Sequence, residues 1–392
     1  MSQRNRRIHY LAFWFSVLLE SSLSTASDHL EENIDRLVKK AGVTASTPGV
    51  GVLVINHGDV LIKKGYGLAN IKERTPIHSE TTFEIASTSK TLTSVGICRL
   101  HDQDRLQFDD PVRKYVPELP ADNEKNPLRI SHLLQHTSGL PDYLSWPEPE
   151  GRHARYADNE DYVQLMAKQP KLVKRHFPVG AKYEYSNTNF LLLAVIAARI
   201  TNQSFGTFMH HEIFKPVGMK QTWIYERPGS HRKHPTLGDV NALGYVKNDK
   251  GKWEVGRGSP PFRDETDLTC GDGSVWTSLD DMVHWDQAIR RGNLVKPATW
   301  GMAMAPSKTM DGKTNEYGYG WGLFFNEDHK LSAFGHNGTY AGFRSSYWRY
   351  TPAWRNDSLD LTVILLSNRG DLGTGSMADD IYDAIDAVKK AP

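Results

Sequence analysis

The sequence predicts an α+β fold in which a mixed antiparallel sheet, flanked by helices, carries an inserted all-helical lobe. Strand patterns lie near both ends of the chain, whereas the stretch from Ser87 to about residue 225 has helical patterns separated by loops with Pro and Gly. We therefore expect the first and last segments to pair in one sheet and the middle to form a separate lobe. A cleft between two such lobes is a common place for a binding site.

The N-terminal part of the fold is expected to be a helix followed by a hairpin. Apolar residues recur at helical spacing between 29 and 41, and Gly42 supplies a C-terminal stop. Residues 50–55 and 60–63 have strand character, and the turn between them contains Gly58. These two segments are therefore predicted to pair as antiparallel strands.

The C-terminal third returns to strands and closes with a helix. Three segments rich in aromatic or β-branched residues are bounded by turn formers, at 317–323, 342–350 and 361–366. The final helix has one apolar stripe, formed by Ile381, Ala384, Ile385 and Val388. We place the α/β lobe at about 27–80 and 225–392, and the helical lobe at about 81–224.

Composition limits the classes of partner. Of the 392 residues, 39% are hydrophobic and 24% are charged, as in an ordinary soluble globular protein. The net charge of +1 creates no field that would attract nucleic acid or an anionic membrane. Cys98 and Cys270 fit neither a redox motif nor a zinc cluster. We expect both cysteines to be structural, with one disulfide as an open alternative.

The N-terminus has the pattern of a signal peptide. Arg4, Arg6 and Arg7 precede an apolar run at residues 8–19, and small residues follow up to Ala26. This predicts a signal peptide over residues 1–26, cut after Ala26, and an exported protein that is periplasmic or secreted. The alternative is an uncleaved membrane anchor, but the run is shorter than the roughly 20 residues that a spanning helix needs. We expect no stable membrane span after cleavage.

A candidate nucleophile lies in the segment that ends with Ser87-Thr88-Ser89-Lys90. Helical periodicity continues beyond this S-x-x-K pattern, so Ser87 and Lys90 are expected one turn apart on one helix face. A serine hydroxyl needs a neighbouring base, and a lysine can serve when burial or nearby positive charge lowers its pKa. The second S-x-x-K match, at residues 230–233, lies in a polar basic stretch and is read as a loop.

Two further patterns accompany Ser87. Tyr185-Ser186-Asn187 precedes the apolar run at 190–198, which predicts a buried helix, and His336-Asn337-Gly338 precedes a strand near the C-terminus. A tyrosine whose pKa is lowered by a nearby cation can act as a general base, and an asparagine amide can hold a substrate carbonyl. The glycine lets a substrate lie close against the strand.

At this point the chain resembles the serine β-lactamases and penicillin-recognising peptidases, whose three motifs are S-x-x-K, Y-x-N and K-T-G or H-x-G. The resemblance covers almost the whole mature chain and implies a β-lactamase/transpeptidase-like fold. It implies that Ser87 forms an acyl-enzyme and that Lys90 and Tyr185 relay its proton, with no metal or cofactor. The substrate-binding residues that it implies are Asn187, His336, Asn337, Gly338 and Thr339. The backbone N–H groups of Ser87 and Thr339 would form the oxyanion hole.

The third motif departs from the lysine form of this family. A lysine there supplies a fixed positive charge near a substrate carboxylate, whereas His336 is only partly charged near neutral pH. Asn337 also replaces the threonine of many relatives. Both changes argue against efficient β-lactam hydrolysis and favour esters or peptides as substrates.

Other residues of types that are common in active sites are better explained by structural or solvent-exposed positions. His136 belongs to a segment that is a structural turn in the family, so we expect a structural role. His210-His211-Glu212 lacks metal-ligand spacing and fits a solvated helix face. Trp276 fits the cleft or the core equally well.

The leading hypothesis is therefore a serine hydrolase that acts by acyl transfer on a small ester, amide or D-amino-acid peptide. Within it we rank ester or short-peptide hydrolysis above D-alanyl-D-alanine carboxypeptidase activity, and both above β-lactamase activity. Two alternatives from other classes are a catalytically idle scaffold that binds cell-envelope material and a membrane-anchored interaction protein.

Overall fold

The computed structural model describes residues 29–390 except 122–124, 147–156, 227–240, 257–267 and 356–357. The predicted signal peptide and the second S-x-x-K match lie outside the described residues. Within those residues no helix combines the length and the apolar character needed to cross a membrane.

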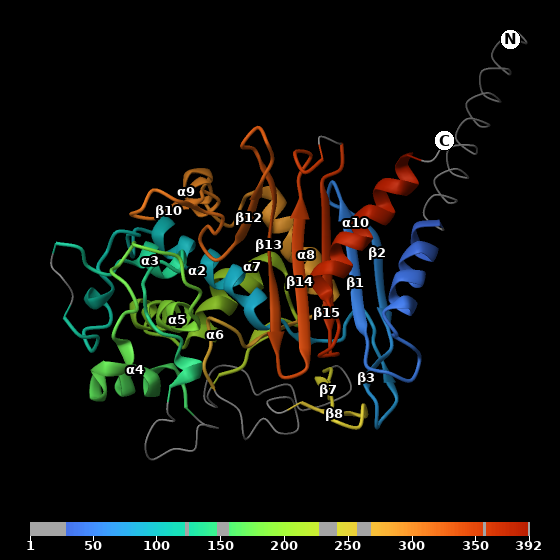
Figure 1. Ribbon diagram of the computed structural model, residues 1–392, viewed down its shortest axis with the longest axis horizontal. Helices are drawn as coiled ribbons and strands as arrows, with labels where there is room; N and C mark the ends of the chain where they lie inside the picture. The colour runs from blue at the N-terminus through green and yellow to red at the C-terminus, as the bar shows by residue number, and fades with distance from the viewer. Residues whose placement is uncertain are drawn as a thin grey trace, which may run out of the picture.

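A six-stranded sheet joins the two ends of the chain (Figure 1). Its strand order is β12-β13-β14-β15-β1-β2, and every neighbouring pair is antiparallel. The strands are β1 (Val50–Asn56), β2 (Asp59–Tyr66), β12 (Gly322–Phe325), β13 (Leu331–Tyr340), β14 (Phe343–Tyr350) and β15 (Leu361–Ser367). The predicted α+β class, with the first and last segments in one sheet, is confirmed.

The N-terminal hairpin forms as predicted. β1 and β2 are joined at His57 and Gly58, whose φ angles of 51° and 94° are both positive. Two successive positive φ angles are typical of the tight hairpin turn whose twist matches that of the strands.

One predicted strand is shorter than expected. The strand expected over 317–323 begins only at Gly322, because Gly318 N donates to Trp321 O across a tight turn. Gly320 has a φ of 75°, and a Cβ there would lie 2.8 Å from the carbonyl oxygen of Lys90. The glycine-rich turn therefore packs directly against the helix that carries Lys90, where a side chain would not fit.

Both faces of the sheet are covered. The helix at residues 29–40 and α10 (Thr374–Lys390) cover one face, where Val52 and Val54 of β1 belong to their apolar cluster. Leu53 and Ile55, which alternate with them, belong to the cluster shared with the helical lobe. This alternation follows from the two-residue period of a strand. The side chain of Val388 lies outside the described residues.

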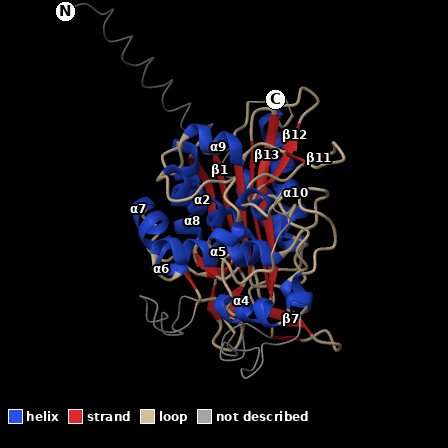
Figure 2. Ribbon diagram, turned by 90° about the vertical axis from the view of Figure 1, so that its left-hand side faces the viewer, coloured by secondary structure: helices blue, strands red, loops and turns tan. Residues whose placement is uncertain are grey.

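The helical lobe lies beside the other face of the sheet (Figures 1 and 2). Its α-helices are α2 (Ser89–Asp102), α3 (Ile130–Leu134), α4 (Asn159–Lys168), α5 (Asn187–Thr201), α6 (Phe205–Met209) and α7 (Lys215–Val217). Short turns of helix connect them at Val112–Lys114, Tyr143–Ser145, Pro170–Val173 and His210–Phe214. The apolar run at 190–198 forms the buried part of α5, as predicted. One apolar cluster joins this lobe to the sheet, so the two lobes share a core.

Small elements complete the fold around the junction of the lobes. A three-stranded sheet pairs β5 (Phe83–Glu84) and β6 (Trp223–Ile224) with β9 (Val275–Thr277). Two helices follow, α8 (Leu279–Arg291) and α9 (Pro297–Ala303). Three two-stranded ribbons are formed by β3 (Leu68–Asn70) with β4 (Thr75–Pro76), β7 (Tyr245–Lys247) with β8 (Trp253–Val255), and β10 (Ser307–Lys308) with β11 (Thr314–Asn315).

The two cysteines are not joined. Cys98 and Cys270 are both buried free thiols, which answers the open question of a disulfide. Burial raises the pKa of the Cys98 thiol to about 12, so it is protonated and unreactive near neutral pH.

Candidate active site

Ser87 lies on a short 3-10 turn, η1 (Ala86–Thr88), between β5 and α2. Ala86 has a φ of 45°, in the left-handed region that residues other than glycine seldom adopt. The turn is anchored to the sheet, because Ser345 Oγ donates to the Ile85 carbonyl oxygen at 2.6 Å. Strained backbone of this kind persists where the surrounding structure holds it, and it is frequent at active sites.

Lys90 lies one helical turn beyond Ser87, with its side chain fully buried. Its Nζ donates to Ser87 Oγ at 3.1 Å, to Asn187 Oδ1 at 2.7 Å and to the Asp272 carbonyl oxygen at 2.7 Å. Burial lowers the pKa of Lys90 to about 8, although the carboxylates of Asp272 and Asp142 act to raise it. A lysine with this pKa is neutral in a useful fraction of molecules near pH 7, and it can then accept the Ser87 proton.

Tyr185 lies in the extended segment just before α5. Its ring is 4.3 Å from the His136 ring, and Lys90 Nζ lies 5.0 Å from its centre. Within the described residues its buried hydroxyl makes no well-aligned hydrogen bond. Burial raises the pKa of Tyr185, and the nearby Ser87 hydroxyl offsets only part of the rise. This contradicts the expectation of a lowered pKa: Tyr185 is a protonated phenol at neutral pH and can only relay a proton.

His136 supports this segment from within the core. It is completely buried with a φ of 55°, and its Nδ1 accepts hydrogen bonds from Ser186 N and Asn189 Nδ2 at 3.2 and 2.9 Å. Burial holds its pKa well below the usual value, so the imidazole is neutral. The side chain therefore fixes the backbone that carries Tyr185, in agreement with a structural role.

Asn187 is held between a cation and an anion. Its Nδ2 and its backbone N both donate to Asp142 Oδ2, at 2.9 and 3.0 Å, while its Oδ1 accepts from Lys90. A carboxylate can only accept and an ammonium can only donate, so the orientation of the amide is fixed. Asn187 thereby holds Lys90, and it also lines the pocket as expected for a substrate-binding residue.

The third motif is split between the two faces of β13. A Cβ on Gly338 would lie 2.2 Å from the Ile85 carbonyl oxygen and 3.1 Å from the Ala86 Cβ, so β13 lies tightly against the Ser87 turn. Asn337 instead accepts a hydrogen bond from Trp348 Nε1 at 2.9 Å and lies beside Gly375 of α10. Successive strand residues face opposite sides of a sheet, and the structure therefore does not bring Asn337 together with Ser87.

His336 lies on the same side as the Ser87 turn but carries no positive charge. Its Nδ1 contacts the Asn337 carbonyl oxygen at 2.6 Å and its Nε2 contacts the Tyr317 hydroxyl at 3.1 Å. Burial, with a further effect of Lys90, lowers the pKa of His336 to about 3. The imidazole is therefore neutral near pH 7, and not partly charged as the sequence suggests.

Thr339 supplies a backbone donor beside Ser87. Tyr340 and Phe343 close the two-residue turn between β13 and β14, and the next pair is Thr339 with Arg344. The closing pair of such a turn is hydrogen-bonded, and hydrogen-bonded pairs alternate with pairs that are not. The Thr339 N–H therefore points away from β14. With the Ser87 N–H it is available as an oxyanion hole, as the sequence resemblance implies.

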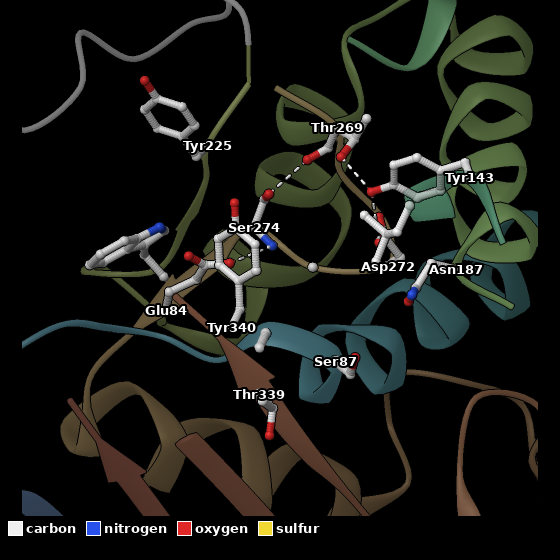
Figure 3. A pocket seen from close by; sticks show the side chains of 14 residues that line it. Glu84, Ser87, Tyr143, Asn187, Tyr225, Thr269, Asp272, Ser274, Thr339 and Tyr340 are labelled. Atoms are coloured by element: carbon white, nitrogen blue, oxygen red, sulfur yellow. Dashed lines mark hydrogen bonds between the residues drawn. The ribbon is translucent and has the colours of Figure 1, made fainter. Parts of the chain in front are cut away.

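Ser87, Asn187 and Thr339 line a pocket between the helical lobe and β13 (Figure 3). Lys90, Tyr185 and His336 lie behind this surface and are not among its lining residues. In this view Thr339 and Ser87 lie at one side, whereas Tyr143, Thr269 and Asp272 lie opposite them. The described residues that line the pocket are Glu84, Ala86, Ser87, Tyr143, Leu144, Asn187, Tyr225, Thr269, Asp272, Gly273, Ser274, Trp276, Thr339 and Tyr340. Trp276 is both a lining residue and a core residue, 2% exposed, with its ring 5.4 Å from that of Trp223.

Sequence reasoning missed two aspartates that contact the candidate catalytic residues. Asp142 orients Asn187, and Asp272 holds Lys90 through its backbone carbonyl oxygen. Weak signals exist for both. Asp142 follows Pro141 at a loop where a capping carboxylate is common, and Asp272 lies between Gly271 and Gly273, where the backbone turns.

A buried lysine that donates to a serine hydroxyl, next to a tyrosine ring and an asparagine amide, is the arrangement of a serine hydrolase. Residues 34–387 match the Beta-lactamase family, and the chain belongs to that family. Catalysis by serine therefore follows from both the geometry and the family.

Two relatives in sequence match most of this chain. The chain is 32% identical over 324 residues to penicillin-binding protein 4* of Bacillus subtilis, covering 81% of this chain and 67% of the relative. It is 27% identical over 322 residues to the protein flp of Staphylococcus aureus, covering 80% of this chain but only 59% of flp.

Solved structures confirm the β-lactamase/transpeptidase-like fold. An octameric penicillin-binding protein homologue from Pyrococcus abyssi matches with a TM-score of 0.72 at 22% identity, over 93% of this chain and 77% of that one. D-amino acid amidase from Ochrobactrum anthropi matches with a TM-score of 0.70 at 22% identity, over 92% and 99%. EstCE1, a hydrolase with promiscuous acyltransferase activity, matches with a TM-score of 0.70 at 20% identity, over 92% and 99%.

Proposed function

We propose that this serine hydrolase acts on a small ester, amide or D-amino-acid peptide by transferring its acyl group to Ser87 and then to water. The observation that carries the proposal is the position of Lys90, whose buried Nζ lies 3.1 Å from Ser87 Oγ with a pKa of about 8. Neutral Lys90 takes the Ser87 proton as Oγ attacks the substrate carbonyl. Lys90 then returns this proton through the Tyr185 hydroxyl to the leaving group, and water hydrolyses the resulting Ser87 ester with the same groups acting in reverse order.

The neutral third motif supports the ranking of substrates. A substrate with a free C-terminal carboxylate, such as a D-alanyl-D-alanine peptide or a penicillin, gains from a fixed positive charge beside β13. His336 does not supply that charge at neutral pH, because its pKa is about 3. We therefore place ester and amide hydrolysis ahead of D-alanyl-D-alanine carboxypeptidase and β-lactamase activity.

Covalent labelling tests the nucleophile directly. The mature protein and its Ser87→Ala variant are incubated with a fluorophosphonate and with a fluorescent penicillin, and the modified peptide is identified by mass spectrometry. We expect the fluorophosphonate to label Ser87 and to leave the variant unmodified. Folded protein that is labelled elsewhere, or that neither reacts nor hydrolyses p-nitrophenyl esters, would exclude the proposed function.

We also propose that the protein is exported after cleavage at Ala26, because arginines and an apolar run precede this residue. N-terminal sequencing of protein recovered from the producing cells tests this. A mature chain that still begins at Met1 would exclude it.

A further inference from the structure

Asp272 is a pocket carboxylate whose side chain has no part in the proton transfers described above. Its backbone carbonyl oxygen holds Lys90, whereas its carboxylate belongs to the wall opposite Thr339 (Figure 3). On that wall Oδ2 accepts from the Tyr143 hydroxyl at 3.1 Å, and the same hydroxyl contacts Thr269 Oγ1 at 2.7 Å. Asp272 is only 9% exposed.

One carboxylate oxygen of Asp272 lacks a partner. Within the described part of the chain, Oδ1 is buried and makes no regular hydrogen bond to another group. An ionised carboxylate that leaves water needs compensating partners, and burial, with a smaller effect of the Asp142 carboxylate, raises the pKa of Asp272. Lys90 counteracts this rise only in part. An ammonium group brought by the substrate would supply the partner that Oδ1 lacks.

The place of Asp272 limits which part of a substrate this cation can belong to. Lys90 Nζ contacts both Ser87 Oγ and the Asp272 carbonyl oxygen, so a single hydrogen-bond donor bridges the nucleophile and the backbone of Asp272. In an α-amino acyl group the amine is separated from the reacting carbonyl carbon by a single carbon atom. None of the described residues that line the pocket is a lysine, arginine or histidine that would compete for the carboxylate.

We propose that Asp272 binds the free ammonium group of the substrate's acyl part, so that the preferred substrates are amides or esters of amino acids with an unblocked α-amino group. This inference rests on the proposed function. An ammonium group bound at Asp272 would also lower the pKa of the neighbouring Lys90, because like charges repel. More of the lysine would then be in the neutral form that accepts the Ser87 proton.

A pair of substrates that differ only in the amine tests the proposal. The rate constants kcat/KM are measured for D-alanine p-nitroanilide and for propionic acid p-nitroanilide, and their ratio is compared between the wild type and Asp272→Asn. We expect the wild type to prefer the amino substrate, and the variant to lose roughly 10- to 100-fold of that preference, as for a hydrogen bond to a charged group.

The matched control is Asp142→Asn, which removes the other carboxylate that acts on Lys90 but does not line the described pocket. It is expected to slow both substrates alike and to leave their ratio unchanged. An unchanged ratio in Asp272→Asn, with both rates lowered together, would show that Asp272 acts only through Lys90 and would overturn the proposal.

Two further measurements distinguish a failure of the proposed ammonium site from a failure of the proposed hydrolase function. N-acetyl-D-alanine p-nitroanilide, which has no charge on nitrogen, should be a poorer substrate of the wild type, and equal rates would refute the proposal without any variant. If fluorophosphonate labels Ser87 but neither anilide turns over, calorimetry on Ser87→Ala compares D-alaninamide with propionamide. Tighter binding of the amine supports the proposal and equal binding refutes it, whereas failure of Ser87 labelling refutes the proposed function itself.

Discussion

Asp142 holds Asn187 through one carboxylate oxygen, which accepts both the backbone N–H and the side-chain Nδ2 at 3.0 and 2.9 Å. The arrangement fixes which end of the Asn187 amide faces Lys90. The Oδ1 atom of Asn187 accepts one of the three hydrogen bonds that Lys90 donates. Asp142 therefore positions the base through Asn187.

Asp142→Asn should therefore reduce kcat by roughly 10- to 100-fold with a small change in KM, because hydrogen bonds to a charged group contribute about 1.5–3 kcal/mol. Asp281→Asn is the matched control. Asp281 accepts two backbone N–H groups, from Lys220 and Gln221, and does not line the described pocket, so only the melting temperature should fall. Equal kcat values for wild type and Asp142→Asn would contradict the assigned role.

The pH dependence follows from the pKa of Lys90. The neutral form accepts the Ser87 proton, and the pKa is about 8, so the active form is lost as the pH falls below 8. We expect kcat/KM to decrease about tenfold per unit on the acid side of this value. Lys90→Arg, which keeps its proton throughout this range, should be inactive at every pH. A flat profile between pH 6 and 9 in the wild type would rule out Lys90 as the base.

Tyr185→Phe separates the hydroxyl from the ring. The ring contacts with His136 and Lys90 are retained, so the variant should fold, but the proton relay is lost. We expect kcat to fall by about 100-fold or more, within the range known for general acid–base groups. Tyr183→Phe removes the hydroxyl of a neighbouring tyrosine that is 40% exposed, and its kcat should match the wild type. Similar kcat values for Tyr185→Phe and Tyr183→Phe would disprove the relay.

Gly338→Ala should disturb the contact between β13 and the Ser87 turn. Its Cβ would lie 2.2 Å from the Ile85 carbonyl oxygen and 2.4 Å from Ser345 Oγ, so the strand must move away from the turn. We expect a loss of about 1–3 kcal/mol in the free energy of unfolding and a lower kcat, because the two oxyanion donors separate. Gly301→Ala on α9 meets nothing within 4 Å and should leave both quantities near wild type. Denaturant melts and ester turnover measure the difference.

Asn337→Ala tests whether the second residue of the third motif acts on substrate. The side chain bonds to Trp348 on the face of the sheet that α10 covers, so its loss should cost about 1 kcal/mol of stability and leave KM unchanged. A raised KM with unchanged stability would place Asn337 in the substrate site after all.

Short-range patterns were sufficient for much of this molecule. The hairpin of β1 and β2, the buried helix α5 and the pairing of the chain ends follow from hydrophobic periodicity and turn chemistry, which are local properties. The spacing of Ser87 and Lys90 likewise follows from the helical repeat. The motifs also identified Tyr185 and Asn187, which the structure brings to Lys90.

The tertiary structure decided the charge of each group and the direction in which it points. Whether Tyr185 has a raised or a lowered pKa depends on burial by segments distant in sequence, and so does the neutrality of His336. Asn337 was predicted to bind substrate but does not lie at the site. Gly338 faces the Ser87 turn, and strand alternation places the Asn337 side chain on the opposite face of β13. Asp142 and Asp272 belong to the site because folding places them in contact with Asn187 and Lys90. Local patterns mark Asp142 and Asp272 only as turn residues, because desolvation and long-range contacts exist only in the folded chain.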